Sequence, residues 1–412
     1  MWKSKQRSDR NDRYRMYGFS LVPSSFRSPH EWEPSQLWRQ FFDLEPDWLD
    51  APLSVVVDAV MPVVPVEDAP AAPSKSRRRR QTFRVFNPDD VAALEQSVAH
   101  LAVKSDRRGA VDTMLRGMKL PTIGERSLAQ VPRRLAQACA LLRREMPNFS
   151  NVIDWMEALL ILQRAGDGAF RLPALLLSGP PGVGKTFFAA RLAELMQTSY
   201  EIVHMESTTA VWVISGSHLG WSSGGPGIVF DALVHRPHAN PIIVLDELDK
   251  ASTDARYPPV NGLYALLEPE TAKTFQDEAC RGVPLDASAI NWIVTANDVS
   301  KIAAPLLSRL KVIEIPEPTF VQRVAIGQCV YRDLRAANEW GRRFAPQLEH
   351  PAACALARVD GSIRSARSVL TSAFASAFGR RSRQVEAEDV IEAVRGPQRQ
   401  EDLATIEPRG RA

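Results

Sequence analysis

The chain has 412 residues, of which 45% are hydrophobic and 24% charged, and its formal net charge is +3. This length allows two or three domains, and the composition is that of a soluble globular protein rather than a fibrous or disordered one. The small net charge gives no general reason to expect nucleic-acid or membrane binding, and no stretch reaches the ~20 apolar residues of a membrane span. The basic N-terminus lacks the apolar centre of a secretory signal. The four cysteines lack metal-site spacing. We therefore expect reduced thiols in a cytoplasmic protein.

Residues 1–85 differ in composition from the rest of the chain. They contain four of the nine tryptophans, and proline, alanine and charged residues dominate 62–80. This pattern predicts a largely flexible extension rich in aromatic residues, proline and arginine. The aromatic segment 32–48 could dock on the protein itself, on a neighbouring subunit or on a partner. The run Arg77–Arg80 is either a solvated charge cluster or a contact for nucleic acid or another anionic partner.

Residues 86–145 are expected to form a helical N-terminal region. Asn87 can cap a helix whose apolar residues recur at helical spacing from Val91 onward. Further helical patterns cover 126–145 and 150–164.

From residue 172 onward, short apolar runs alternate with helical segments. This alternation predicts an α/β core at 146–317, in which helices flank a parallel sheet. From Phe320 the pattern is purely helical, so we expect a small all-helical domain at 318–396 and a flexible tail at 397–412. The runs expected to form strands are LPALLLS, EIVHM, PIIVLDE, INWIVTAN and LKVIEI.

A phosphate-binding loop follows the first of these strands. Its eight residues fit the pattern GxxxxGK[ST] and precede a helical run, which is the context that the P-loop requires. Backbone N–H groups of such a loop surround the β- and γ-phosphates of ATP, while the lysine adds a positive charge and the threonine hydroxyl binds Mg²⁺. The residues are Gly179, Pro180, Pro181, Gly182, Val183, Gly184, Lys185 and Thr186.

Three further segments supply groups for hydrolysis. The strand that ends in Asp246 and Glu247 resembles a Walker B segment, in which Asp246 would hold Mg²⁺ and Glu247 would act as the general base. Asn297 closes another strand and could orient the attacking water, although a turn asparagine would look the same. Arg309 could reach the nucleotide of a neighbouring subunit, or it could be an ordinary surface arginine.

In this order, the four segments resemble those of an AAA+ ATPase, and more closely the ATPase module of Lon-type proteases. The resemblance runs from about Met146 to Val394, and by it Arg364 contacts the γ-phosphate from the lid as the sensor 2 arginine. The fold class that it implies is a P-loop AAA+ parallel sheet flanked by helices, followed by a helical lid. Matching stretches are LDELDK, LLEPE, FQD, VPLDAS, IVTAN, PLLSRLKVIEIP and GSIR.

The chain also departs from Lon-type proteases. In those proteins a proteolytic domain with a serine–lysine dyad follows the lid, whereas this sequence stops at Ala412. We therefore expect no peptidase activity of its own. Residues before 146 show no clear resemblance to the Lon substrate-binding domain.

The glycine-rich segment 218–227 bears on the substrate. Counting back from Pro226, Trp221 falls where Lon-type motors carry an aromatic residue that grips substrate in the central pore. A tryptophan among glycines suits a loop that holds polypeptide by apolar contact, although packing against a neighbouring subunit would explain it too.

These features predict an ATPase that assembles as a homo-oligomeric ring, a hexamer by the resemblance, and remodels or unfolds proteins like a chaperone. An ATPase acting on nucleic acid is the first alternative, and Arg77–Arg80 could then bind phosphates. A nucleotide-gated scaffold is the second, although it would not need Glu247, Asn297 and Arg309 together. We expect no membrane partner.

Overall fold

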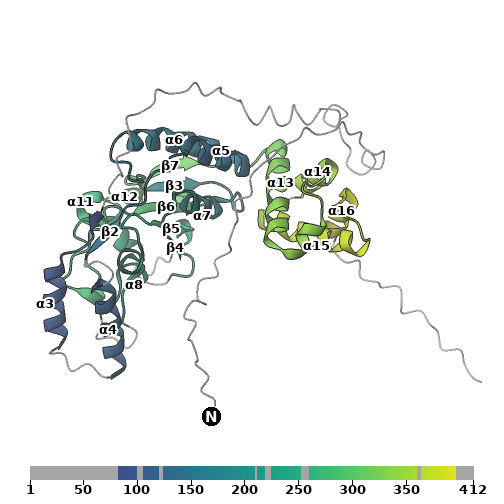
Figure 1. Cartoon of the computed structure of the whole chain (residues 1–412). Coiled ribbons are helices and arrows are strands. Elements are labelled where there is room, and N and C mark those ends of the chain that lie inside the picture. Colours follow the sequence, from purple (N-terminus) through teal and green to yellow (C-terminus); the bar gives the residue numbers. More distant parts are fainter. Residues whose placement is uncertain are drawn as a thin grey trace, which may run out of the picture. The chain divides into compact units, whose positions relative to one another are not determined.

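The computed structural model describes residues 82–99, 105–119, 124–208, 211–218, 224–251, 259–359 and 363–395. They fall into two compact units that meet in the sequence between Pro318 and Thr319. The first contains a parallel sheet with helices on both faces, and the described part of the second contains helices alone (Figure 1). The predicted fold class is confirmed.

Five strands form the sheet, in the order β4-β5-β6-β3-β7, and each pairs in parallel with its neighbours. Each strand coincides with one of the apolar runs predicted to form strands, except that β4 begins one residue earlier, at Tyr200. Because the strands are parallel, the loops after β3, β5 and β6 emerge at one edge, where α/β sheets bind ligands. The strands are β3 (Leu175–Ser178), β4 (Tyr200–His204), β5 (Ile242–Asp246), β6 (Asn291–Ala296) and β7 (Lys311–Glu314).

Alternate side chains of the central strands enter two separate hydrophobic cores, as the pleat of a strand requires. Leu175 and Leu177 pack among residues of the three long helices on one face, whereas Leu176 packs in the core on the other face. Phe149 of η2 (Pro147–Phe149) stacks on Phe188 at 4.8 Å between ring centroids. The long helices are α5 (Leu135–Glu145), α6 (Ser150–Ala165) and α7 (Lys185–Met196).

The N-terminal described segment packs on the second of these cores, through Phe86, Met114 and Met118 among others. The predicted Asn87 cap is present, because its side-chain Oδ1 accepts from the Asp89 N–H at 3.3 Å. Strands β1 and β2 pair antiparallel and were not predicted. The elements are β1 (Thr82–Arg84), α3 (Pro88–Ala99), α4 (Ser105–Lys119) and β2 (Glu125–Ser127).

The helix predicted at 126–145 begins only at Leu135. Arg126 lies in β2 instead, where its buried guanidinium donates to the Val234 carbonyl at 2.6 Å. Pro132 follows before the helix starts, and the residue before a proline is disfavoured in helical conformation. A tertiary contact and a proline therefore shorten the helix that periodicity suggested.

Short helical turns connect the strands of the core unit. They position the loops described below and contribute to the core that contains Leu176. They are α8 (Trp212–Ser215), α9 (Ile228–Phe230), η3 (Asp231–His235), η4 (Leu248–Lys250), η5 (Pro259–Gly262), α10 (Leu263–Leu266), α11 (Pro269–Ala272), η6 (Glu278–Cys280), η7 (Val299–Lys301) and α12 (Ala304–Leu307).

A buried carboxylate fixes both flanks of the glycine-rich segment 218–227. Asp277 is fully buried, and its two oxygens accept from the backbone N–H groups of Gly227 and Ala279, each at 2.8 Å. Gly216 has φ +73°, and a Cβ there would lie 2.0 Å from Asp277 Oδ1, so the close approach requires glycine. Ser217 N–H donates to the Gly225 carbonyl at 2.8 Å, which closes the base of the segment.

The helical unit is organised around stacked aromatic rings. Tyr331 stacks on Phe374 at 4.9 Å, and Trp340 and Phe344 meet Phe374 edge-on. Helix α13 begins with a capping box between Thr319 and the Gln322 three residues on. The helices are α13 (Phe320–Ala337), η8 (Glu339–Arg343), α14 (His350–Ala357), α15 (Ile363–Gly379) and α16 (Ala387–Arg395).

None of the described helices is long and apolar enough to cross a bilayer. All four cysteines are buried, and none of them forms a disulfide. Burial raises the pKa of Cys139 to about 12, which keeps this thiol protonated and unreactive near neutral pH.

We predict that Asp277→Ala lowers the free energy of unfolding at pH 5 by about 2–4 kcal/mol, because two buried N–H groups lose their acceptor. Urea unfolding measures the change. Glu278→Ala is the matched control, because Glu278 neighbours Asp277 but pairs with Arg281 at the surface. Equal stability of the two variants would contradict this role of Asp277.

The same substitution should cost less at pH 8 than at pH 5. Burial raises the pKa of Asp277 to about 7, so the folded chain keeps this proton where the unfolded chain releases it. The stabilisation by Asp277 therefore decreases as pH rises from about 4 to about 7.

Candidate active site

The predicted P-loop connects β3 to α7 at the carboxyl edge of the sheet. Gly182 and Gly184 have φ of +82° and +101°, a conformation that side chains with a Cβ rarely adopt, so the loop requires glycine at both positions. Asn148 supports the loop from η2, because its Nδ2 donates to the Val183 carbonyl at 3.4 Å. Its Oδ1 is buried and has no hydrogen-bond partner within the described part of the chain.

Lys185 is held inside this loop. Its side chain is 7% exposed, and its ammonium donates to the Gly179 and Pro180 carbonyls at 2.6 and 2.9 Å. The third partner is Asn297 Oδ1 at 2.8 Å, which brings together two residues predicted from separate motifs. Burial lowers the pKa of Lys185, although the nearby carboxylates, Asp249 first, oppose the shift.

Asp246 joins three segments of the chain. Its Oδ1 accepts from the Thr186 hydroxyl at 2.6 Å and from the Thr295 hydroxyl at 2.8 Å. His204, at the end of β4, lies 3.3 Å from the other oxygen. A threonine hydroxyl beside a carboxylate is the hard-oxygen donor set that Mg²⁺ binds in nucleotide sites. The side chains of Thr186 and Asp246 thus fit the ion predicted for them.

Glu247 has a left-handed backbone, with φ 56° and ψ 52°. A non-glycine residue in this conformation is strained, and such strain gathers at functional sites. Its N–H donates to Thr295 Oγ1 at 2.9 Å, and its carboxylate receives the Lys250 ammonium at 2.9 Å. The two adjacent acids therefore have different partners. Asp246 accepts from two threonine hydroxyls, whereas Glu247 pairs with Lys250.

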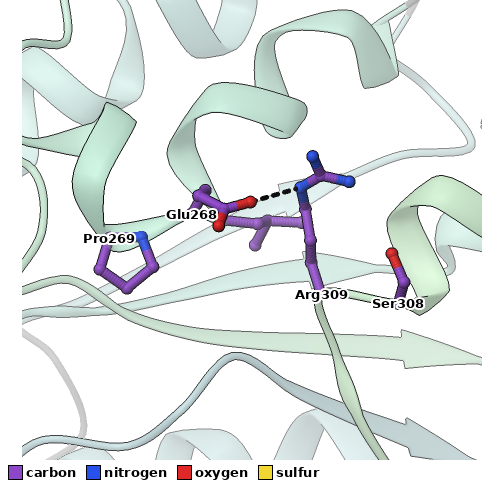
Figure 2. Close-up of a pocket in the computed structure, with 5 residues that line it drawn as sticks. Glu268, Pro269, Ser308 and Arg309 are labelled. Carbon is purple, nitrogen blue, oxygen red and sulfur yellow. Dashed lines mark hydrogen bonds and ion pairs between the residues drawn. The ribbon is translucent and has the colours of Figure 1, made fainter.

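Arg309 lies at the edge of the sheet formed by the amino ends of the strands, opposite the P-loop. Lys311, two residues later, pairs with Leu175 at the start of β3, whereas the P-loop follows the end of β3. At about 3.3 Å per residue, this register separates Arg309 from the P-loop by roughly 20 Å along the strand direction. The guanidinium donates to Glu268 and to the Pro305 carbonyl, beside a pocket at the surface of the unit (Figure 2).

The remaining predicted residues lie either in the helical unit or outside the described residues. Arg364 is exposed at the start of α15 in the helical unit, and its contact with nucleotide stays a prediction. Trp221 lies outside the described residues, as do Arg77–Arg80 and the segment 32–48.

Sequence reasoning missed Thr295 and Glu268. Thr295 is buried in β6 and bonds to both Walker B residues, and its position two before Asn297 on an alternating strand was a usable signal. Glu268 carried no such signal, because its partner Arg309 is distant in sequence and on another element.

Residues 175–317 match the family described as ATPase family associated with various cellular activities (AAA). The peroxisomal Lon protease homolog 2 of Oryza sativa subsp. indica is 35% identical over 156 residues, which are 38% of this chain and 18% of that protein. Lon protease 1 of Thermus thermophilus is 36% identical over 38% of this chain and 20% of its own length. The match thus spans about a fifth of these relatives. The predicted resemblance to Lon-type ATPase modules is confirmed over this region.

Among solved structures, the Thermotoga maritima RuvB Holliday junction branch migration motor matches at 16% identity with a TM-score of 0.41. The match covers 60% of this chain and 68% of the RuvB chain.

We predict that Thr295→Val lowers the free energy of unfolding by about 1–3 kcal/mol, because the Glu247 N–H loses its acceptor and Asp246 loses a donor. Chemical denaturation measures the change. Thr295→Ser keeps the hydroxyl and is the matched control, for which we expect a smaller loss. If valine proves no worse than serine, the hydroxyl does not hold the two acids in place.

Proposed function

Because residues 175–317 carry the AAA-family domain, we propose that this chain binds ATP with Mg²⁺ and hydrolyses it. The observation that carries the proposal is the 2.6 Å contact between Thr186 and Asp246, beside an ammonium held in the P-loop. Two motifs from separate segments thereby form one site for a metal-bound phosphate.

We propose that phosphate oxygens replace the carbonyl groups that now hold Lys185. The carbonyls of Gly179 and Pro180 are neutral acceptors, and an anionic oxygen is a stronger partner for an ammonium. Thr186 and Asp246 would hold Mg²⁺, which neutralises charge on the phosphates when bound.

In the hydrolysis step, a water oxygen forms a bond to the γ-phosphorus while the bond to the β–γ bridging oxygen breaks. The Glu247 carboxylate accepts the proton of that water, and ADP leaves with the electron pair of the broken bond. Asn297 would orient the water through its side chain, and Lys250 holds Glu247 in place until the water binds.

Arg309 is proposed to act on the nucleotide of a neighbouring subunit. The strand register supports this, because it places Arg309 at the edge of the sheet opposite the P-loop. A homo-oligomeric ring brings one subunit's Arg309 to the next subunit's phosphate, and six subunits follow from the resemblance to Lon-type motors. Arg364 would contact the γ-phosphate from within the same subunit.

We propose polypeptide as the substrate of this ring, which would then remodel or unfold proteins. Support comes from the Lon proteases that match the ATPase region and from Trp221 in the glycine-rich segment. Asp277 fixes the flanks of that segment, as a loop that transmits force would require. A cytoplasmic location and the lack of an intrinsic peptidase stay predictions.

We predict that Glu247→Gln binds ATP almost as wild type but hydrolyses it about 10²–10⁴-fold more slowly, because an amide has the shape of the base without its proton affinity. Equilibrium binding and steady-state turnover measure the two effects. Lys185→Ala is the contrasting variant and should lose binding itself. Wild-type turnover by Glu247→Gln would remove Glu247 from the role of base.

We predict that unfolded casein stimulates the ATPase rate, and that Trp221→Ala abolishes the stimulation. Trp212→Ala is the matched control, because it removes a partly exposed tryptophan from the preceding helix α8. Stimulation by single- or double-stranded DNA with indifference to casein would favour the nucleic-acid alternative. Slow turnover that no polymer changes would favour a nucleotide-gated scaffold.

A further inference from the structure

The guanidinium of Arg309 is held from three directions. Its Nε donates to Glu268 Oε2 at 3.1 Å, and its Nη1 donates to the Pro305 carbonyl at 2.6 Å. The Tyr264 ring lies 5.8 Å from the guanidinium carbon, within range of a cation–π contact. Figure 2 shows the contact between Glu268 and Arg309 at the pocket. Leu267, Pro269 and Ser308 also line this pocket.

The position of Glu268 is fixed by its own backbone. Pro269 follows it, and a residue before proline is driven out of the helical region, which Glu268 obeys with φ −104° and ψ 116°. Its carbonyl accepts from the Ala272 N–H at 2.9 Å, which starts the next helix turn. The carboxylate therefore projects from a rigid corner between α10 and α11.

This arrangement leaves the outer end of Arg309 available. Nη2 has no partner among the described residues, and Nη1 has one N–H beyond its bond to Pro305. Glu268 occupies the Nε side, so it does not compete for the end of the guanidinium that would meet an anion. The partner contacts fix the direction of the side chain without using up its terminal donors.

We propose that Glu268 is a positioning residue that presents Arg309 to the γ-phosphate bound by a neighbouring subunit. This inference rests on the proposed function. A free arginine loses considerable rotamer freedom when it binds an anion, and an arginine already held by a carboxylate loses less. Glu268 is 48% exposed, so the ion pair adds little to folding stability, and orientation is the role left for it.

The test compares kcat and KM for ATP among full-length variants that form the same oligomer. For Glu268→Ala we expect kcat to fall about tenfold with KM little changed. Glu268→Gln should recover most of the rate, because its amide oxygen still accepts from Nε. The double variant with Arg309→Ala should be no slower than Arg309→Ala alone. Glu270→Ala is the matched control, because Glu270 lies two residues away and pairs with Lys273.

Mixed rings test whether Glu268 acts on the neighbour. Subunits with Lys185→Ala cannot bind nucleotide but still offer Arg309 to the wild-type subunits mixed with them. Adding Glu268→Ala to the Lys185→Ala subunits should lower turnover in the wild-type neighbours. A structural effect inside the altered subunit alone would leave that turnover unchanged.

Two results would overturn the inference. Wild-type turnover by Glu268→Ala, with Arg309→Ala inactive, shows that Arg309 needs no positioning. Faster turnover by Glu268→Ala shows that Glu268 restrains Arg309 instead. Wild-type turnover by Arg309→Ala would instead remove Arg309 as the finger, which is a failure of the proposed function and is recognised by that single variant.

Discussion

The Asp246 carboxylate joins parts of the chain that the sequence keeps far apart. One of its oxygens accepts from Thr186, just after β3, and from Thr295 on β6, while Asp246 itself ends β5. These contacts are possible because the three strands are adjacent and parallel, so their carboxyl ends share one edge. The positions of the P-loop, Glu247 and Asn297 all depend on this one edge. A shift in strand register would move all three away from one another.

The contacts of Lys185 show how the fold satisfies a buried charge. Removing an ammonium from water is unfavourable, and here two backbone carbonyls and one amide oxygen offset part of that cost. The partners are neutral, so an anion can displace them. The loop thus holds the Lys185 ammonium where an anionic phosphate oxygen could contact it.

The fold and part of the site could be predicted because they follow from local patterns. Apolar runs gave all five strands of the sheet, and the order of polar residues after them gave Lys185, Asp246 and Asn297 as neighbours. Strand β2 could not be predicted, because Arg126 is buried there by a contact with Val234, more than a hundred residues away. Thr295 and Glu268 escaped notice for a related reason. Both act through side-chain hydrogen bonds to residues that are distant in the sequence, and hydrophobic periodicity does not reveal such bonds.

The position of Arg309 within the core unit bears on how subunits assemble. Within the core unit the register of β7 against β3 sends Arg309 to the amino edge, while the groups that surround phosphate gather at the carboxyl edge. An arginine fixed by Glu268 and Pro305 cannot swing across that distance without losing both partners. A phosphate site that uses Arg309 must therefore be completed by a second copy of the chain. Under the proposed role of Arg309, turnover would then depend on assembly.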